Sequence, residues 1–381
     1  MSTTAVMPAP SRPEPVSRRQ EPGYFQRQLP VALILGSFVF LTLPLAGLAL
    51  ANPLLMDRWH IGLLYIVVFG TTHFVLTLTI YLQSSNLRYF SSTWRNRALY
   101  FLIPLAIFVF FDLYRALQIA VILPVFDTIF RLGIRFFDFQ HFGRQNYGVL
   151  QLFKGRAKCP FPAWVKKAES CYFFGLTALL MLTFLYGGQF DGTRLPTILV
   201  LVYAGCTLLA VLAGFAVAWR QVQDRSVLLA PFAYLLLQSV SAALGIYSSL
   251  LYVFCLAMHY VEYHVVMIPR CFNTPLNAQN RTDRLFQRLR QNKVIFYLLL
   301  LVLAGVVTSL TWMAMGYMIA AMEQSRGQSY LVLISIFDGL FVFHYFIEAF
   351  IWKFSDPYYR QTLGPLYFGP GRPKSGQPSA A

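Results

Sequence analysis

Residues 195–219 read LPTILVLVYAGCTLLAVLAGFAVAW, an uninterrupted stretch that contains no charged side chain. About 20 apolar residues are enough for an α-helix to cross the hydrocarbon core of a bilayer. A helix satisfies its own backbone hydrogen bonds, as any segment surrounded by lipid must. The stretch therefore predicts a membrane-spanning helix, and the rest of the chain can be compared with it.

The composition of the whole chain agrees with this prediction. Of the 381 residues, 57% are hydrophobic and 12% are charged, and the mean hydropathy is +0.55. A soluble domain has about twice that charged fraction, so this chain has too little polar surface to face water on every side. We predict an all-α, polytopic transmembrane helix bundle of about ten spans. The predicted spans are 31–53, 61–83, 98–123, 126–153, 171–188, 195–219, 228–246, 248–269, 294–322 and 329–353.

The net charge of +16 is concentrated between these segments. Basic loops follow the second, fourth, sixth and eighth spans, whereas the loops on the other side are short and poor in Lys and Arg. Because positive charge in short loops marks the cytoplasmic face, we expect both termini in the cytoplasm. We also expect a bacterial-type inner membrane and no nucleic-acid partner, since no soluble module carries the charge.

The two ends of the chain differ from its middle in composition. Residues 1–28 are rich in Pro, Ser and Arg and predict a disordered cytoplasmic tail. Residues 29–356 form the predicted transmembrane helical domain, and residues 357–381 form a predicted cytoplasmic C-terminal tail. The third and fourth spans allow two divisions, because residues 98–153 could also divide around Asp112–Arg115. The total number of spans is even in both cases.

Five of the six histidines lie inside apolar spans, and ionisable groups there are costly enough to suggest a function. His60 lies in an outer loop and needs no such explanation. Four of the others precede the cytoplasmic end of their span by nine to twelve residues: His73, His141, His259 and His344. That is a depth of roughly 14–18 Å at the helical rise. Four like-directed helices thus offer one imidazole each at one level, which predicts a metal or haem site.

Two glutamates have spacings compatible with this site. His344 and Glu348 are four residues apart and share a helix face. Glu262 lies close to the face of His259, whereas His264 points about 140° away, where it would serve a neighbouring site or orient another ligand. We predict that the five intramembrane histidines form the metal site. Glu262 and Glu348 are predicted to ligate the metal or to relay protons.

The fourth span has one polar face, whose members follow at steps of three or four residues: Arg131, Arg135, Asp138, His141 and Gln145. Asn146 flanks this face. Such a helix must line the bundle interior or a hydrated cavity. We predict that Asp138 is catalytic and that Arg131, Arg135, Gln145 and Asn146 bind the cofactor. Alternatively, Arg131 and Arg135 pair with Asp127 and Asp138 only to neutralise buried charge.

Imidazole with carboxylate suits iron, copper or zinc, and we expect a metal ion, with iron first and haem as an alternative. The one-histidine-per-helix pattern of His73, His141, His259 and His344 resembles Brp/Blh-type β-carotene oxygenases. That resemblance implies a polytopic fold, iron-binding histidines on separate spans and an isoprenoid-like substrate.

The first hypothesis is a membrane-bound, metal-dependent oxidoreductase or oxygenase of lipid metabolism. It would act on an apolar small molecule, such as a fatty acyl chain, sterol or isoprenoid, among membrane lipids, with an electron donor as a possible partner. The alternatives are a multi-pass transporter with an intramembrane polar pathway and a haem b-binding electron-transfer protein.

Overall fold

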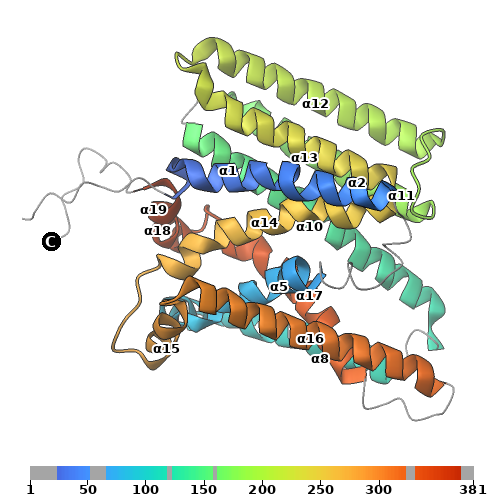
Figure 1. The fold of residues 1–381 in the computed structure, drawn as a ribbon, viewed down its shortest axis with the longest axis vertical. Coiled ribbons are helices and arrows are strands. Elements are labelled where there is room, and N and C mark those ends of the chain that lie inside the picture. Colours follow the sequence, from blue (N-terminus) through green and yellow to red (C-terminus); the bar gives the residue numbers. More distant parts are fainter. Residues whose placement is uncertain (1–23, 52–65, 118–121, 158–160, 323–330, 370–381) are drawn as a thin grey trace, which may run out of the picture.

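A computed structural model describes residues 24–51, 66–117, 122–157, 161–322 and 331–369. Every regular element in these ranges is a helix, and one isolated β-bridge joins Gln189 to Ser248 (Figure 1). The predicted all-α fold is confirmed for this part of the chain. His60, residues 1–23 of the predicted N-terminal tail and residues 370–381 of the predicted C-terminal tail lie outside the described residues. The end of the predicted disordered tail is folded instead, because Tyr24–Gln26 form a 3₁₀ helix in which Phe25 is buried.

The long helices follow the predicted apolar segments. Their bounds are α1 Gln28–Ser37, α2 Leu43–Ala51, α8 Ile103–Ala116, α10 Pro124–Ala157, α11 Ala163–Leu185, α12 Leu195–Gln221, α13 Leu229–Tyr247, α14 Ser249–Phe272, α16 Lys293–Met322 and α17 Leu331–Ile351. Shorter helices connect or flank them: α5 Thr72–Thr77, α6 Ser84–Ser91, α7 Trp94–Arg97, α15 Arg281–Arg290, α18 Pro357–Thr362 and α19 Gly364–Phe368.

Five helical segments are long and apolar enough to cross a membrane, and two bent pairs raise the number to seven. The five are Gln28–Ala51, Trp94–Tyr114, Ala163–Leu185, Leu195–Gln221 and Arg225–Tyr247. The bent pairs turn by 78° after Leu82 and by 101° after Arg290. The remaining three of the ten predicted spans correspond to α10, α14 and α17, which carry histidines.

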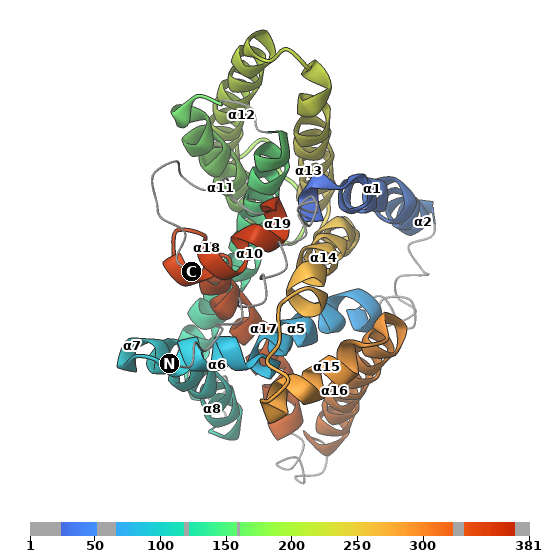
Figure 2. The same cartoon turned by 90° about the vertical axis from the view of Figure 1, so that its left-hand side faces the viewer.

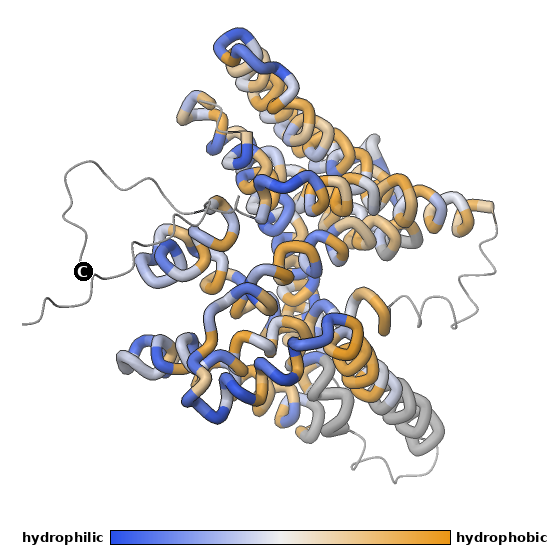
Figure 3. Tube along the Cα trace, turned by 60° about the vertical axis from the view of Figure 1, so that its left-hand side comes forward, coloured by the Kyte–Doolittle hydropathy of each residue, from blue (hydrophilic) through white to orange (hydrophobic). Residues whose placement is uncertain are grey.

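Lipid is the natural solvent of the outer helices. Leu195, Leu199, Val202 and Leu209 on α12 are 59–67% exposed, although each is fully apolar. Figure 3 shows apolar residues along most of each long helix and hydrophilic residues mainly at helix ends and in connections. This distribution is typical of helices that face hydrocarbon along their length and water at their ends.

The helices that carry the intramembrane histidines, α5, α10, α14 and α17, lie between two groups of other helices (Figures 1 and 2). On one side α11 packs against both α10 and α12, and on the other α17 packs against α8 and α16. α14 contacts α1, α10 and α13. The helices that carry the intramembrane histidines therefore meet in the interior of the fold, where the other helices cover them.

The third and fourth predicted spans divide at a proline. α8 continues past Asp112 to Ala116, and α10 begins at Pro124. Pro at a first helical position is favourable because its missing N–H is not needed there. The helix α8 thus ends just after Arg115, close to the alternative division, whereas α10 begins at Pro124, close to the first division, and is one continuous helix of 34 residues.

The predicted C-terminal tail starts with two packed helices. Tyr359 on α18 and Tyr367 on α19 are buried, and the Tyr367 hydroxyl donates to the Val266 carbonyl oxygen at 2.6 Å. The Gln26 amide donates to the Phe368 carbonyl oxygen at 2.7 Å, which ties this segment to the N-terminal end of α1. Residues 357–368 thus belong to the folded domain, because their aromatic side chains fill its end.

Candidate metal centre

Four helices bring one histidine each to the same place. His73 lies on α5, His141 on α10, His259 on α14 and His344 on α17, and all four are buried. The ring centroid of His73 lies 4.3 Å from that of His344, 5.1 Å from that of His259 and 6.2 Å from that of His141. The His141 ring is 5.0 Å from His344 and 5.1 Å from His259. The predicted convergence of the four imidazoles is confirmed.

Their ligand atoms form two overlapping groups. One ligand atom each from His73, His141 and His259 lie within 4.8 Å of one another, and so do those of His141, His344 and Glu348. The Glu348 Oε2 is 3.4 Å from His141 Nδ1 and 3.9 Å from His344 Nε2. Side-chain movements of about 1–2 Å would bring such atoms to ligand distances near 2 Å. The groups could therefore hold a metal ion.

The backbone around His73 departs from regular α-helix. A π-helical turn, Ile66–Thr71, precedes α5, and a 3₁₀ turn, Leu78–Leu82, follows it. Such π-turns inside helices occur frequently at functional sites, where they re-aim a side chain. In this segment every residue of α5 is buried, and His73 faces α14 and α17.

A chain of hydrogen bonds orients His344. Its Nδ1 lies 2.6 Å from Thr77 Oγ1, which is also 2.6 Å from the Tyr263 hydroxyl. Tyr263 in turn hydrogen-bonds Glu348. With the His344 proton on Nδ1 and donated to Thr77, the Nε2 atom is an acceptor. That atom lies 2.7 Å from His73 Nε2, so the two rings share one hydrogen bond.

Several buried nitrogens of the cluster lack a hydrogen-bond partner among the described residues. These are His73 Nδ1, His141 Nε2 and His259 Nδ1. Buried polar atoms are hydrogen-bonded in the great majority of cases, and exceptions need an explanation. Unprotonated imidazole nitrogens are good ligands for iron, copper and zinc, so a bound cation explains these atoms chemically.

Glu262 belongs to a separate polar network, although sequence spacing places it close to His259. Gln238 on α13 donates to Glu262 and to the Tyr234 hydroxyl, and Asn146 donates to the Gln238 oxygen at 3.1 Å. Gln145 hydrogen-bonds Glu262 and donates to the His259 carbonyl oxygen at 2.8 Å. Glu262 and Asn146 therefore hold α10, α13 and α14 together through Gln238, and among the described residues neither forms a hydrogen bond with a histidine ring. Gln145 connects this network to the His259 backbone.

Three charged residues on the polar face of α10 have partners in the structure: Arg131, Arg135 and Asp138. Arg131 forms an ion pair with Asp127 at 2.8 Å, and its side chain is 69% exposed. Arg135 pairs with Asp138 at 3.0 Å. The other Asp138 oxygen accepts a hydrogen bond from the Tyr345 hydroxyl at 2.6 Å. Both arginines thus have the carboxylate partners that the alternative names, although their side chains are exposed, and their cofactor contacts stay a prediction. Asp138 positions Tyr345.

Tyr345 links Asp138 to the centre, because the Tyr345 ring stacks on that of His141 with centroids 4.3 Å apart.

His264 lies at the edge of the cluster. Its ring centroid is 6.5 Å from that of His73, and the Phe69 backbone hydrogen-bonds it. It is absent from both ligand groups. The structure thus places His264 where a residue that supports His73 would lie.

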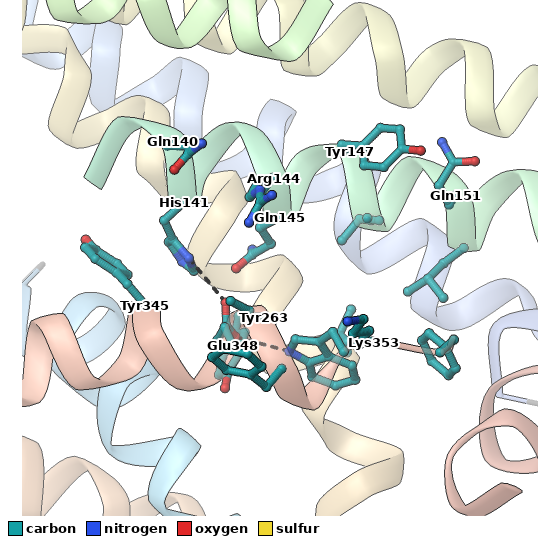
Figure 4. A pocket seen from close by; sticks show the side chains of 18 of the residues that line it. Gln140, His141, Arg144, Gln145, Tyr147, Gln151, Tyr263, Tyr345, Glu348 and Lys353 are labelled. Carbon is teal, nitrogen blue, oxygen red and sulfur yellow. Dashed lines mark hydrogen bonds and ion pairs between the residues drawn. The ribbon is translucent and has the colours of Figure 1, made fainter. Parts of the chain in front are cut away.

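A large cavity opens on the centre between α10 and α17. Its volume is about 1040 Å³, and its walls include His141, Gln145, Tyr263, Tyr345 and Glu348. Figure 4 shows His141 and Glu348 on the cavity wall, pointing toward each other and joined by a dashed line, with Tyr345 to one side. Ligand pockets have volumes of about 300–1,000 Å³, so this space would hold a sizeable organic molecule next to the candidate ligands.

Sequence reasoning missed Thr77, Tyr263 and Gln238. Thr77 and Tyr263 each follow a histidine by four residues, which is the same spacing that links His344 to Glu348. This spacing puts them on the histidine's helix face, so the signal was present in the sequence. Gln238 gave no comparable signal, because it lies on a helix without histidines.

Comparisons with protein-family models, with curated proteins and with solved structures each found no match to this chain.

Proposed function

We propose that this protein is an integral-membrane, metal-dependent oxidoreductase or oxygenase with a non-haem iron centre, acting on a lipid or isoprenoid-like substrate. One observation carries the proposal. Two imidazoles and one carboxylate, from His141, His344 and Glu348, gather within 4.8 Å beside a cavity of about 1040 Å³. Two histidines with one carboxylate and open positions are the ligand set of non-haem iron oxygenases.

The residues of the chain would divide the work as follows. His141, His344 and Glu348 would hold the ion, and His73 and His259 form, with His141, a second group of candidate donors. Iron, when bound, would supply the chemistry of dioxygen activation or electron transfer, and a donor protein or cofactor would provide the electrons. Thr77 and Asp138 would keep His344 and His141 in ligating positions, through a direct hydrogen bond and through Tyr345, respectively.

The position of the centre supports an apolar substrate. The cavity walls are mostly apolar, with Ile134, Phe137, Val342 and Phe346 among the lining residues. A molecule dissolved in the bilayer would reach these side chains without first entering water. We include in the proposal about ten spans, both termini in the cytoplasm and a bacterial-type inner membrane, on the distribution of basic loops.

Two alternatives have weaker support. A transport pathway would use Arg131 and Arg135, but each of them already has a carboxylate partner. A haem b would need its porphyrin plane between two facing imidazoles, whereas the His73 and His344 Nε2 atoms are 2.7 Å apart. The architectural resemblance to Brp/Blh-type β-carotene oxygenases agrees with the proposed iron and with its histidine ligands.

Elemental analysis of the purified full chain tests the proposal. We expect bound iron without a haem absorbance band, and loss of that iron in His73→Ala and in His344→Ala while membrane insertion persists. Phe343→Ala is the matched control, because it removes a buried ring next to His344 but no metal donor. Iron absent from the wild type, or retained by both histidine variants, would overturn the proposal.

A further inference from the structure

The cavity beside the candidate metal centre is lined by both apolar and basic side chains. Ile134, Phe137, Val342 and Phe346 form an apolar wall on α10 and α17. Four basic side chains also line the cavity, one each from α10, α11, the end of α17 and α18: Arg144, Lys166, Lys353 and Arg360. Glu348 is the only acidic residue among the described residues that line it, and it belongs to the candidate ligand set.

These cations lack carboxylate partners. No ion pair joins Arg144, Lys166, Lys353 or Arg360 to an acid within the part of the chain that the structure describes. Lys154 provides the contrast in the same region, since its ammonium lies 2.7 Å from Glu169 Oε1 and both side chains are buried. The fold thus neutralises the buried lysine and leaves the cavity-lining cations available.

The cations and the candidate ligands lie along the same walls. Figure 4 shows Lys353, which follows the end of α17, just beyond Glu348, and Gln151 well beyond His141 on α10. Ten residues separate His141 from Gln151, which is about 15 Å of helix. A molecule with its charged head near Lys353 and Lys166 would thus place its chain, and not its head, beside His141 and Glu348.

We propose that the cavity binds an amphiphile with an anionic head, a carboxylate or phosphate, whose apolar chain passes the metal centre. This inference rests on the proposed function and names its substrate class. Lys166, Lys353 and Arg360 hold the head at the rim. The chain lies against Phe137, Val342 and Phe346. The part of the molecule that lies beside the centre is then a carbon remote from the head.

Basic residues at the cytoplasmic ends of spans are expected in any membrane protein. A comparison of Lys166 with Lys167 distinguishes positive charge that only sets membrane topology from positive charge that binds a ligand. The two residues are neighbours on α11 and both are exposed, but only Lys166 lines the cavity. If the positive charge serves only membrane topology, the two lysines are equivalent; if it binds a ligand head, they differ.

Binding to the purified full chain in nanodiscs of uncharged phosphatidylcholine tests the inference. The probes are brominated laurate, brominated dodecyl phosphate and brominated dodecanol, which share a chain and differ in the head. Quenching of Trp352 fluorescence reports occupancy, because Trp352 lines the cavity; Trp352→Phe identifies its share of the signal. We expect both anionic probes to bind more tightly than the alcohol, and the tighter of the two identifies the natural head.

The variant Lys166→Gln/Lys353→Gln should weaken binding of the anionic probes by about tenfold or more, since a charge-assisted hydrogen bond contributes about 1.5–3 kcal/mol. Dodecanol binding should stay within about twofold. Lys167→Gln should leave all three affinities unchanged. Equal binding of the three probes, or equal effects of the two lysine positions, would overturn the inference. Because binding needs no turnover, this result is independent of the iron content that tests the proposed function.

Discussion

Thr77→Val is the sharpest test of how the centre is built. The substitution keeps the shape of the side chain and removes the hydroxyl that lies 2.6 Å from both His344 Nδ1 and the Tyr263 hydroxyl. Residues that orient a metal-binding imidazole in this way typically contribute a factor of about 10–100 in metal affinity. That factor corresponds to about 1.4–2.8 kcal/mol, close to the cost of leaving one buried polar group unpaired.

Titration of the metal-depleted protein with Fe(II), under anaerobic conditions, measures the affinity directly. Thr79→Val is the matched control, because Thr79 is also buried in this segment and donates to the Leu76 carbonyl oxygen at 2.7 Å without touching a histidine. Both variants should lose about 1 kcal/mol of stability, and Thr77→Val alone should lose iron affinity. Equal iron affinities in the two variants would show that Thr77 does not orient a ligand.

Two further predictions concern the packing of α10, which carries His141. Gly143→Ala should destabilise the protein by about 1–3 kcal/mol in thermal unfolding, since the added Cβ would lie 2.7 Å from Thr177 Oγ1. Gly148→Ala, which meets nothing within 4 Å on the same helix, should be neutral or stabilising, and equal losses would contradict this packing. Glu169→Leu should cost about 3–5 kcal/mol, because it removes the carboxylate of a buried ion pair and leaves the charged Lys154 ammonium in place. Lys154→Met/Glu169→Leu should recover most of that loss, and an equally unstable double variant would refute the assignment.

The all-helical, membrane-spanning character could be predicted because it depends on composition over windows of about 20 residues. The bends could not. Hydropathy describes how apolar a segment is and not its direction, so the 78° turn after Leu82 and the 101° turn after Arg290 gave no sequence signal. The helices at residues 357–368 were missed for a related reason, because Gly and Pro content hides buried aromatic residues such as Tyr359 and Tyr367.

The level of the histidines could be predicted more reliably than their directions around the helix axis. Rise per residue is constant, so equal distances from the cytoplasmic ends placed His73, His141, His259 and His344 at one depth. Rotation depends on which neighbour each helix packs against. Glu262 follows His259 by three residues and yet contacts Gln238 on α13, because α14 lies between that helix and the centre.

The energetics of the cluster point to a ligand. His73, His141 and His259 each leave one buried nitrogen without a hydrogen-bond partner among the described residues. At about 1–3 kcal/mol for each such atom, the cost is about 3–9 kcal/mol. The net stability of a whole domain is only about 5–15 kcal/mol, so a cluster without a ligand would cost a large part of that stability. A cation that accepts these lone pairs returns much of the cost, and it does so at the wall of a cavity that an amphiphile can enter. In the proposed function the cluster and the cavity are one site, and a metal bound there would stabilise the helices that form it.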